Sequence, residues 1–580
     1  MNSDNRLPPG QDTPAPPPAS VRDPAEPALP EPEGGEAGPG PGDVTGAGTA
    51  ASTRATVGKA ALIILAATVV GRVFGLVRDM AVAHFFGANA TTDAFFLAYK
   101  IPYLLALTVG GALTATFIPV FTQRLVSGRR DEAWKLTVSM INTVVLVLSG
   151  LTVALIVLAP WVVPLFGPGF DPSTMDLAVS LFRILMPGVV FAGLAGLATG
   201  VLNSLKGFSV PAFSASVGAV VTIIFMAVFS GSWGITSLAV GTTVGTVAMF
   251  LVLVPQMRRK GLRYTPRIDW RLPGMTQVAV MVWPILIGSA VGKVSIFVDQ
   301  VLGSLLGEGS ISALNYSEKL FQLPLGLFVA GITIPIFPLL SEQVAARRPD
   351  RVNATLAFAL RLIAFVIVPA SVGLIVLRVP IVALLFQNGG KFTADDTART
   401  AWALFMYSIG LYSYAGRDTL TRVFYAYHDT RTPVTISVIA VGINIACSYV
   451  LMQSMGVGGL ALGTTIALTV NYVVLGELMR RRLGFVGFGG VTRALARVVG
   501  ASAVMGVVVW AIDLVLAGSL GSGTLGMGLR VLCGVVGGAV AYLAVAAAGR
   551  LPELREVLDM LKSVTGRARP GEDTSSLRRT

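Results

Sequence analysis

Apolar side chains occur in long runs along most of this chain, and short polar stretches separate the runs. A run of about 20 apolar residues is long enough to cross the hydrocarbon core of a bilayer as a helix. Fourteen such runs follow one another, so we predict an all-α polytopic membrane protein with 14 transmembrane helices. The predicted spans are 59–84, 93–122, 135–161, 176–203, 210–230, 235–257, 276–304, 311–341, 353–376, 397–426, 433–454, 457–479, 492–517 and 527–549.

The second part of this pattern repeats the first. Gly234–Thr243 (GITSLAVGTT) returns 222 residues later as Gly456–Thr465 (GVGGLALGTT), and Ile118–Phe121 (IPVF) returns 216 residues later as Ile334–Phe337 (IPIF). Each copy holds six spans. Because six is even, the two copies have the same orientation, and we predict two parallel six-helix repeats plus two C-terminal helices. Duplicated bundles of this kind are typical of transporters with a central site.

Basic residues lie mainly in the loops that follow even-numbered spans, and Lys391 is the main exception. Short cytoplasmic loops are enriched in Lys and Arg, so this alternation places both termini in the cytoplasm (N-in/C-in). It also accounts for the net charge of +13 without a nucleic-acid partner. The basic residues of the even-numbered loops include Arg124, Arg129, Arg130, Lys206, Arg258, Arg259, Lys260, Arg347, Arg348, Arg431, Arg480 and Arg481.

Composition agrees with a membrane protein, since 53% of the residues are hydrophobic and only 13% are charged. Soluble proteins carry about 25% charged residues. The first 57 residues differ, because they are rich in Pro, Gly, Ala and Glu and cannot bury enough apolar surface to fold. No apolar stretch near Met1 resembles a cleavable signal peptide. The expected organisation is a disordered cytosolic tail (1–57), a six-helix bundle (58–260), a cytosolic linker (261–275), a second six-helix bundle (276–482), two extra transmembrane helices (483–549) and a basic cytosolic tail (550–580).

Ionisable residues inside membrane spans are costly and are therefore candidates for function. Here they gather in spans one, two, seven, eight and ten, and spans seven and eight are the repeat counterparts of spans one and two. We predict a cavity between the two copies, positive enough to hold an anionic head group, because Arg and Lys pair well with phosphate oxygens. The candidate ligands of the anion are Arg72, Arg78, Lys100 and Lys319, and Asp93 is the candidate gate residue.

The alternative is that each basic residue neutralises a neighbouring acid or extends to the membrane interface. Arg78 beside Asp79, and Arg417 beside Asp418, would be structural pairs of this kind.

Asp299 is an acid within an apolar span, and Asn444 in span eleven would supply a further oxygen. Oxygen ligands suit a hard cation such as Na⁺, whereas a lone carboxylate would carry a proton. The sequence therefore indicates a candidate cation or proton site at Asp299 and Asn444, and a hydrogen-bonded packing acid is the equal alternative.

Prolines inside spans two and eight, such as Pro102 and Pro324, indicate either hinges for alternating access or static kinks.

Enzyme motifs are missing from the sequence. We find no Walker loop, no Gly-x-Ser-x-Gly motif and no His/Cys cluster with metal-ligand spacing, and the only histidines are His84 and His428. Nothing assembles a nucleophile with a base. We therefore expect no cofactor, no metal site and no enzymatic activity, and the sequence indicates a transporter.

Several motifs together resemble a known family. They are Gly71–Asp79 (GRVFGLVRD), Phe86–Ala88 (FGA), Thr92–Phe96 (TDAFF), Leu202–Ser204 (LNS), Phe208–Phe213 (FSVPAF), Gly390–Thr393 (GKFT) and Thr430–Val434 (TRTPV). Their ordered set resembles the MurJ (MviN) lipid II flippases over most of residues 59–549. The resemblance implies the multidrug/oligosaccharidyl-lipid/polysaccharide exporter fold with fourteen helices in a bacterial plasma membrane. It also implies peptidoglycan biosynthesis as the process, a cationic central cavity, and a lipid-tail groove at the last two helices.

The implied activity is the flipping of lipid II, an undecaprenyl-pyrophosphate-linked glycopeptide, from the inner to the outer leaflet. Some positions depart from the family pattern: Ala106 and Leu107 stand where many members have an Arg pair, and Lys319 stands where an Arg is frequent. A flippase for another polyprenyl-linked glycan is therefore one alternative. A drug/cation antiporter of the related multidrug-extrusion branch is another, and a scaffold that contacts the cell-wall synthesis machinery through its tails is a third. Na⁺ or H⁺ coupling stays open.

Overall fold

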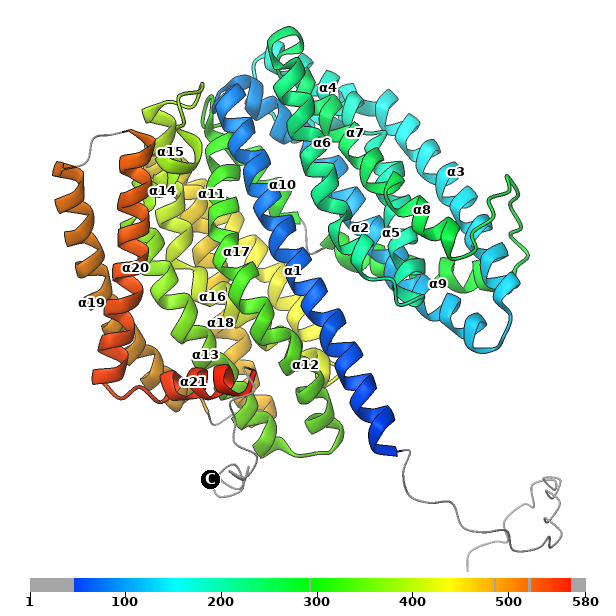
Figure 1. Ribbon diagram of the computed structural model, residues 1–580. Helices are drawn as coiled ribbons and strands as arrows, with labels where there is room; N and C mark the ends of the chain where they lie inside the picture. The colour runs from blue at the N-terminus through cyan, green and yellow to red at the C-terminus, as the bar shows by residue number, and fades with distance from the viewer. Residues whose placement is uncertain (1–45, 292–293, 485–486, 520–522, 565–580) are drawn as a thin grey trace, which may run out of the picture. The chain divides into compact units, whose positions relative to one another are not determined.

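Each apolar run forms one helix or two consecutive helices in the computed structural model, which describes residues 46–564 apart from 292–293, 485–486 and 520–522. Within these ranges every regular element is a helix (Figure 1). Eleven of the described helical segments are long and apolar enough to cross a membrane. The predicted spans 59–84, 276–304 and 397–426 are not among the eleven, and they coincide with α1, with α9 and α10, and with α15 and α16. The chain is thus a helical, multi-pass membrane protein.

The first group of helices, here called the N-lobe, packs around α2 (Ala90–Val126). Asn89 starts this helix, because its side-chain oxygen accepts hydrogen bonds from the Thr91 and Thr92 backbone N–H groups. The helix continues through Pro102 and Pro119 without a break. The other members are α3 (Arg130–Val162), the short 3₁₀ helix η1 (Val163–Leu165), α4 (Pro172–Leu185), α5 (Gly188–Ser204), α6 (Ser209–Trp233), α7 (Thr236–Leu251), α8 (Leu253–Arg259) and α9 (Pro273–Val291).

The second group, here called the C-lobe, packs around α18, which contacts α15, α16 and α17. In this lobe span eight is divided: α11 ends at Pro324, and a π-helical turn, η2 (Leu325–Val329), precedes α12. π-helical turns inside membrane helices are frequent at functional sites. The C-lobe contains α10 (Val294–Ser304), α11 (Ser310–Pro324), α12 (Ala330–Ala345), α13 (Pro349–Val376), α14 (Arg378–Phe386), α15 (Ala394–Ile409), α16 (Leu411–Ala426), α17 (Arg431–Met455) and α18 (Val457–Leu483).

Span seven divides between the two lobes. Its first half, α9, packs against α2 and α3, and Met275 and Val278 are buried in the N-lobe core. Its second half, α10, packs against α11, α17 and α18 of the C-lobe. The predicted start of the second bundle at residue 276 is therefore wrong in structural terms. Sequence repeats record ancestry, whereas side-chain packing decides which lobe a half-helix joins.

Helix α1 (Gly46–Phe86) begins before the predicted end of the N-terminal tail, so residues 46–57 are helical rather than disordered. Residues 1–45, which make up most of that predicted tail, lie outside the described residues. The C-terminal half of α1 contributes Val82, Ala83 and Phe86 to the main apolar core.

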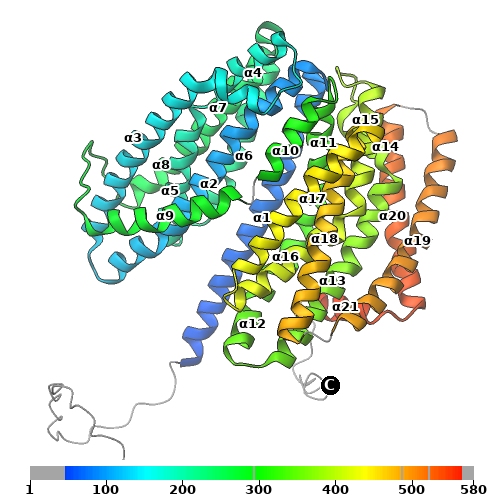
Figure 2. The same ribbon diagram turned by 180° about the vertical axis from the view of Figure 1, so that it is seen from behind.

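The last helices pack on one side of the C-lobe. Helix α19 (Phe488–Ser519) contacts α13 and α20 (Thr524–Ala548), and α20 also contacts α14 (Figure 2). A further helix, α21 (Pro552–Val564), was not predicted, because its apolar residues form one stripe rather than a continuous run. It is held by the buried Leu551 and by an Arg361–Glu556 contact of 3.9 Å. The predicted tail 550–580 is thus helical at its start, and residues 565–580 lie outside the described residues.

The apolar cores differ between the two ends of the helices. The odd-loop end is the end with the loops at 87–89, 163–171, 305–309 and 387–393, and the opposite end is the even-loop end. At the odd-loop end a single core joins the lobes, and it includes Phe96 of α2, Tyr316 of α11 and Phe386 of α14. At the even-loop end each lobe has its own core, around Phe121 in the N-lobe and around Phe424 in the C-lobe. The lobes are therefore joined at one end and separate at the other.

Candidate functional site

Asp93 joins the two lobes at the odd-loop end. Its carboxylate accepts hydrogen bonds from the Gly309 backbone N–H (2.7 Å), the Ser312 backbone N–H (2.7 Å) and the Ser312 hydroxyl (2.6 Å). These groups form the N-terminus of α11, where backbone N–H groups lack helical partners and the helix dipole favours a negative charge. Asp93 is only 1% exposed. The predicted gate residue thus lies at a closed contact between the lobes.

Further close backbone contacts lie around the Asp93 carboxylate and the N-terminus of α11. The Tyr316 hydroxyl donates to the Gly87 carbonyl (3.1 Å), and the Lys391 backbone N–H donates to the His84 carbonyl (2.9 Å). The Gly169 backbone N–H donates to the Ser304 hydroxyl (3.2 Å), and a Cβ on Gly169 would lie 2.3 Å from the Ser304 carbonyl oxygen. The lobes are thus in backbone contact at this end, with no room for a side chain at position 169.

A cavity of about 600 Å³ lies between the lobes beyond this contact. It is lined by α1 and α2 on one side and by α10, α11, α15, α16, α17 and α18 on the other. Its lining reaches Tyr425 and Pro433, close to the even-loop end. Four basic and two acidic side chains face it, so the cavity carries an excess of positive charge. They are Arg78, Lys100, Lys319, Arg417, Asp299 and Glu318.

Two of the predicted ligands in this cavity have acidic partners. Arg78 donates to Asp79 from Nε (3.1 Å) and from Nη2 (2.7 Å), so the pairing considered as an alternative is present, and Arg78 lines the cavity as well. Lys100 lies 3.5 Å from the Glu318 carboxylate across the lobe boundary. Both bases are therefore held in position by a carboxylate while their charge faces the cavity.

Two further cations have no carboxylate within ion-pair distance among the described residues, although Asp79 and Glu318 lie near enough to Lys319 to act on its charge. Among the described residues, neither Lys319 nor Arg417 forms an ion pair, and the Arg417 guanidinium lies 5.5 Å above the Tyr414 ring. The alternative considered from the sequence paired Arg417 with its neighbour Asp418, but Asp418 bonds Arg422 one helical turn later (3.1 Å). Residues four apart share a helix face, which favours Asp418 with Arg422, but this spacing is no general signal because the adjacent residues Arg78 and Asp79 also bond.

Arg72 is not among the cavity-lining residues. Its guanidinium lies against Gly326 in η2, where a Cβ would be 1.8 Å from the Arg72 Cζ. Its Nε is buried without a hydrogen-bond partner. Contact between Arg72 and a ligand therefore stays a prediction, and in this conformation the side chain fills a gap between α1 and the C-lobe.

Asp299 and Asn444 both line the cavity. Asn444 donates to the Thr464 hydroxyl (3.1 Å) and to the Ser448 hydroxyl (3.3 Å), which leaves its Oδ1 buried and without a donor. The Asp299 Oδ1 is likewise buried without a donor. Two orphaned oxygens in one cavity wall fit the predicted cation or proton site. In the part of the chain that the structure describes, no group of three or more His, Cys, Asp or Glu residues forms a metal-binding cluster.

Comparisons with known proteins agree on one family. The family profile described as "Lipid II flippase MurJ" matches residues 82–529. A probable lipid II flippase MurJ of Vibrio cholerae is 32% identical over 511 residues, which cover 84% of this chain and 95% of that protein. The lipid II flippase MurJ of Burkholderia cenocepacia is 32% identical over 457 residues, which cover 77% of this chain and 88% of that protein.

Solved structures give the same result. One described as "Lipid II flippase MurJ, inward closed conformation" matches with a TM-score of 0.71 and 25% identity, over 86% of this chain and 100% of that chain. An inward-facing multidrug resistance MATE transporter of the MOP superfamily matches with a TM-score of 0.61 and 15% identity, over 73% of this chain and 98% of that chain. The second likeness establishes a shared fold only.

Proposed function

Since the chain belongs to the MurJ family of lipid II flippases, we propose that it moves lipid II from the inner to the outer leaflet of the bacterial plasma membrane by alternating access. It is a multi-pass membrane transporter and not an enzyme. The substrate is an undecaprenyl-pyrophosphate-linked glycopeptide, and peptidoglycan synthesis is the process it serves.

The observation that carries this proposal is the charge of the central cavity. Four cations line it, and the described residues place no carboxylate within ion-pair distance of two of them, Lys319 and Arg417, although Asp79 and Glu318 act on Lys319 from farther away. Unpaired bases in a low-dielectric cavity are costly unless an anion enters, and a pyrophosphate supplies several strong acceptor oxygens. We assign the pyrophosphate to Arg78, Lys100, Lys319 and Arg417. Arg72 keeps its predicted contact for a conformation in which it leaves Gly326.

The orientation is part of the proposal. Fourteen spans with both termini in the cytoplasm would put the odd-loop end outside the cell and the even-loop end in the cytoplasm. In that orientation the Asp93 contact is an outer gate that is closed, and the cavity faces the inner leaflet, where the substrate is made. Contacts of the two tails with the cell-wall synthesis machinery stay a prediction.

We also propose that Asp299 and Asn444 bind a coupling cation, Na⁺ or H⁺. The orphaned oxygens of both residues support this, since buried oxygens without donors suit a hard cation or a proton. The transmembrane potential adds about 2.3 kcal/mol per elementary charge at 100 mV. Thr464→Val would test the site through the Na⁺ and pH dependence of transport, because it removes a hydroxyl that orients Asn444.

Substitution of the unpaired cations tests the phosphate assignment. We expect Arg417→Ala and Lys319→Ala to abolish growth support in cells depleted of their own flippase, at normal protein level. Arg422→Ala is the matched control, because Arg422 lies on the same helix, pairs with Asp418 and does not line the cavity. Equal growth support by Arg417→Ala and Arg422→Ala would remove Arg417 from the site.

A leaflet assay separates this function from its alternatives. Outer-leaflet lipid II should recover in depleted cells that express this chain. A flippase for another polyprenyl-linked glycan, a drug/cation antiporter or a scaffold would leave outer-leaflet lipid II unchanged. The excess of bases over acids in the cavity disfavours the antiporter, whose cationic substrates need acids.

A further inference from the structure

A second cavity, here called the N-lobe chamber, lies inside the N-lobe and has a volume of about 560 Å³. It lies among α1, α2, α4, α5, α6 and α7, and Lys319 of α11 closes one side. Sites for organic ligands commonly occupy about 300–1,000 Å³. The chamber is therefore large enough for part of a substrate.

Small residues keep this space open. Eight glycines line the chamber, and bulky apolar side chains are few along its wall. Two of the glycines also let α6 and α7 approach closely, since a Cβ on Gly245 would lie 2.5 Å from the Gly218 carbonyl oxygen. Others face open space: a Cβ on Gly111 would meet no atom within 4 Å. The chamber is thus framed by fixed helix contacts and is not closed by side chains.

Charge is confined to one side of the chamber. Arg78 and Lys319 line both the chamber and the central cavity, and so do Tyr99 and Tyr103. The rest of the chamber wall carries no ionisable side chain. A ligand whose phosphates lie at Arg78 and Lys319 would therefore have an uncharged space directly beside those phosphates, with a mainly apolar wall that carries several threonine hydroxyls.

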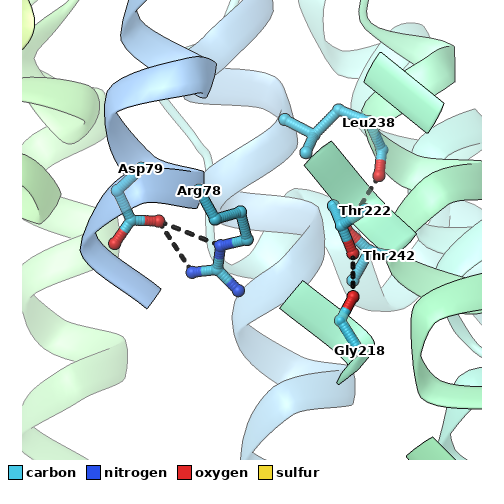
Figure 3. A network of polar contacts seen from close by, with 6 residues as sticks. All are labelled: Arg78, Asp79, Gly218, Thr222, Leu238 and Thr242. Atoms are coloured by element: carbon cyan, nitrogen blue, oxygen red, sulfur yellow. Dashed lines mark hydrogen bonds and ion pairs between the residues drawn. The ribbon is translucent and has the colours of Figure 1, made fainter. Parts of the chain in front are cut away.

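Hydroxyl groups supply the polarity of that space. The lining threonines are Thr114, Thr199, Thr222, Thr242, Thr243 and Thr246. Thr242 donates to the Leu238 carbonyl (2.7 Å), Thr246 to the Thr242 carbonyl (2.9 Å), and Thr222 to the Gly218 carbonyl (2.9 Å). Figure 3 shows Thr222 and Thr242 on the side of Arg78 that faces away from Asp79.

These bonds use the hydroxyl protons and leave oxygen lone pairs as acceptors toward the chamber. Thr199 has no hydrogen-bond partner in the described part of the chain, so its hydroxyl is free to donate or accept. The wall is uncharged and mainly apolar, and its threonine oxygens can accept from a group that carries its own hydroxyl and amide donors. The wall offers no counter-ion to a charged peptide.

We propose that the N-lobe chamber binds the N-acylated sugar that is attached to the pyrophosphate of the substrate. This assignment rests on the proposed flippase function and adds a subsite to it. The pyrophosphate lies at Arg78 and Lys319, the first sugar enters the chamber, and its hydroxyl and amide groups bond the threonine oxygens. The chamber is then the part of the site that distinguishes glycan-bearing from bare polyprenyl lipids.

Binding of two probes to the purified full-length chain tests this subsite. The probes are lipid II and undecaprenyl pyrophosphate, which has the same phosphates and lipid chain but no sugar. We expect Gly111→Leu, which fills the chamber, and the double variant Thr242→Val/Thr246→Val each to weaken lipid II binding about tenfold or more, as expected for the loss of one or two hydrogen bonds. Binding of undecaprenyl pyrophosphate should stay unchanged.

Matched controls exclude general damage to the fold. Gly150→Leu places the same side chain on an exposed, open position of α3, and Thr137→Val removes a hydroxyl that bonds the Ala133 carbonyl away from the chamber. Both should bind both probes as the unsubstituted chain does.

The outcomes separate the subsite from the function. If Gly111→Leu weakened the binding of both probes equally, the chamber would belong to the lipid chain or the phosphates, and the sugar subsite would be overturned. Unchanged binding of both probes would also overturn the sugar subsite. Lys319→Ala should weaken both probes. If the unsubstituted chain bound neither probe, the proposed function itself would be contradicted.

Discussion

At the scale of single residues, Arg72 and Gly326 form an unusual pair. The Arg72 guanidinium occupies the space where any side chain at position 326 would begin, and its Nε is buried without a partner. A buried polar group without a hydrogen bond costs about 1–3 kcal/mol. Arg72 forms no ion pair with a described residue, so packing against the π-helical turn holds this side chain in place.

Gly326→Ala should expel Arg72 from that space. Because the new Cβ would lie 1.8 Å from the Arg72 Cζ, we expect a destabilisation of about 1–3 kcal/mol and reduced growth support. Thermal unfolding of the purified protein measures the change. In an Arg72→Ala background the same substitution should cost much less, because the clashing group is gone. Gly331→Ala, which meets no atom within 4 Å, is the control and should be neutral.

At the scale of helices, the sequence predicts well where the helices lie, but it does not predict where a helix is interrupted. All predicted spans coincide with helices, since bilayer thickness fixes the length of an apolar run. The π-helical turn after Pro324 and the division of span seven depend on tertiary contacts that no local pattern records. The amphipathic α21 was missed because its apolar stripe is not a continuous run.

The residues of the site likewise include some that the sequence predicted and some that it missed. Arg78, Lys100 and Lys319 line one cavity, as the clustering of charges in repeat-related spans predicts. Arg417 was not among the predicted ligands, because the sequence offered its neighbour Asp418 as a structural partner, whereas the Asp418 side chain bonds Arg422. The glycines and threonines of the N-lobe chamber gave no signal, because such residues are common in membrane helices wherever helices pack closely.

The contact between α2 and the N-terminus of α11 is predicted to hold the gate closed. Asp93→Ala removes the acceptor of three hydrogen bonds and leaves the Gly309 and Ser312 N–H groups unpaired. We expect this to open the gate more often. A cysteine at Asn315, which lies in the cavity wall behind the gate, should then react faster with a membrane-impermeant thiol reagent added outside.

The assay uses a background in which Cys447 and Cys533 are replaced by Ser. Asp176→Ala removes an exposed carboxylate from α4 near the same end and should leave the labelling rate unchanged. Equal labelling in the Asp93→Ala and Asp176→Ala chains would mean that Asp93 does not hold the gate.

At the scale of the whole molecule, the distribution of apolar cores gives the mechanism its two states. A single core joins the lobes at the odd-loop end, whereas each lobe has its own core at the even-loop end. Alternating access requires the reverse arrangement as the second state, and packed interfaces switch between discrete arrangements instead of deforming continuously. Contacts made only in the present state should therefore bias the equilibrium between the two.

The close approach of Gly169 to Ser304 is a contact of this kind. Gly169→Ala would place a Cβ 2.3 Å from the Ser304 carbonyl oxygen and 2.9 Å from the Leu305 Cα, and neither backbone atom can rotate away. We expect the closed odd-loop end to lose population. Spin labels at positions 176 and 395 are both exposed near this end, and the distance between them should lengthen in the Gly169→Ala chain. In the control Gly231→Ala no atom lies within 4 Å of the new Cβ, and the distance between the labels should not change.

A second pair of labels decides whether the motion is alternating access. Positions 127 and 351 are exposed on the N-lobe and the C-lobe at the even-loop end. If the lobes move as rigid bodies about the central cavity, Gly169→Ala must shorten the distance between these labels in the same fraction of molecules in which the odd-loop distance lengthens. Opening at the odd-loop end without closure at the even-loop end would produce a channel through both ends. That result would contradict a flippase that exposes its cavity to one leaflet at a time.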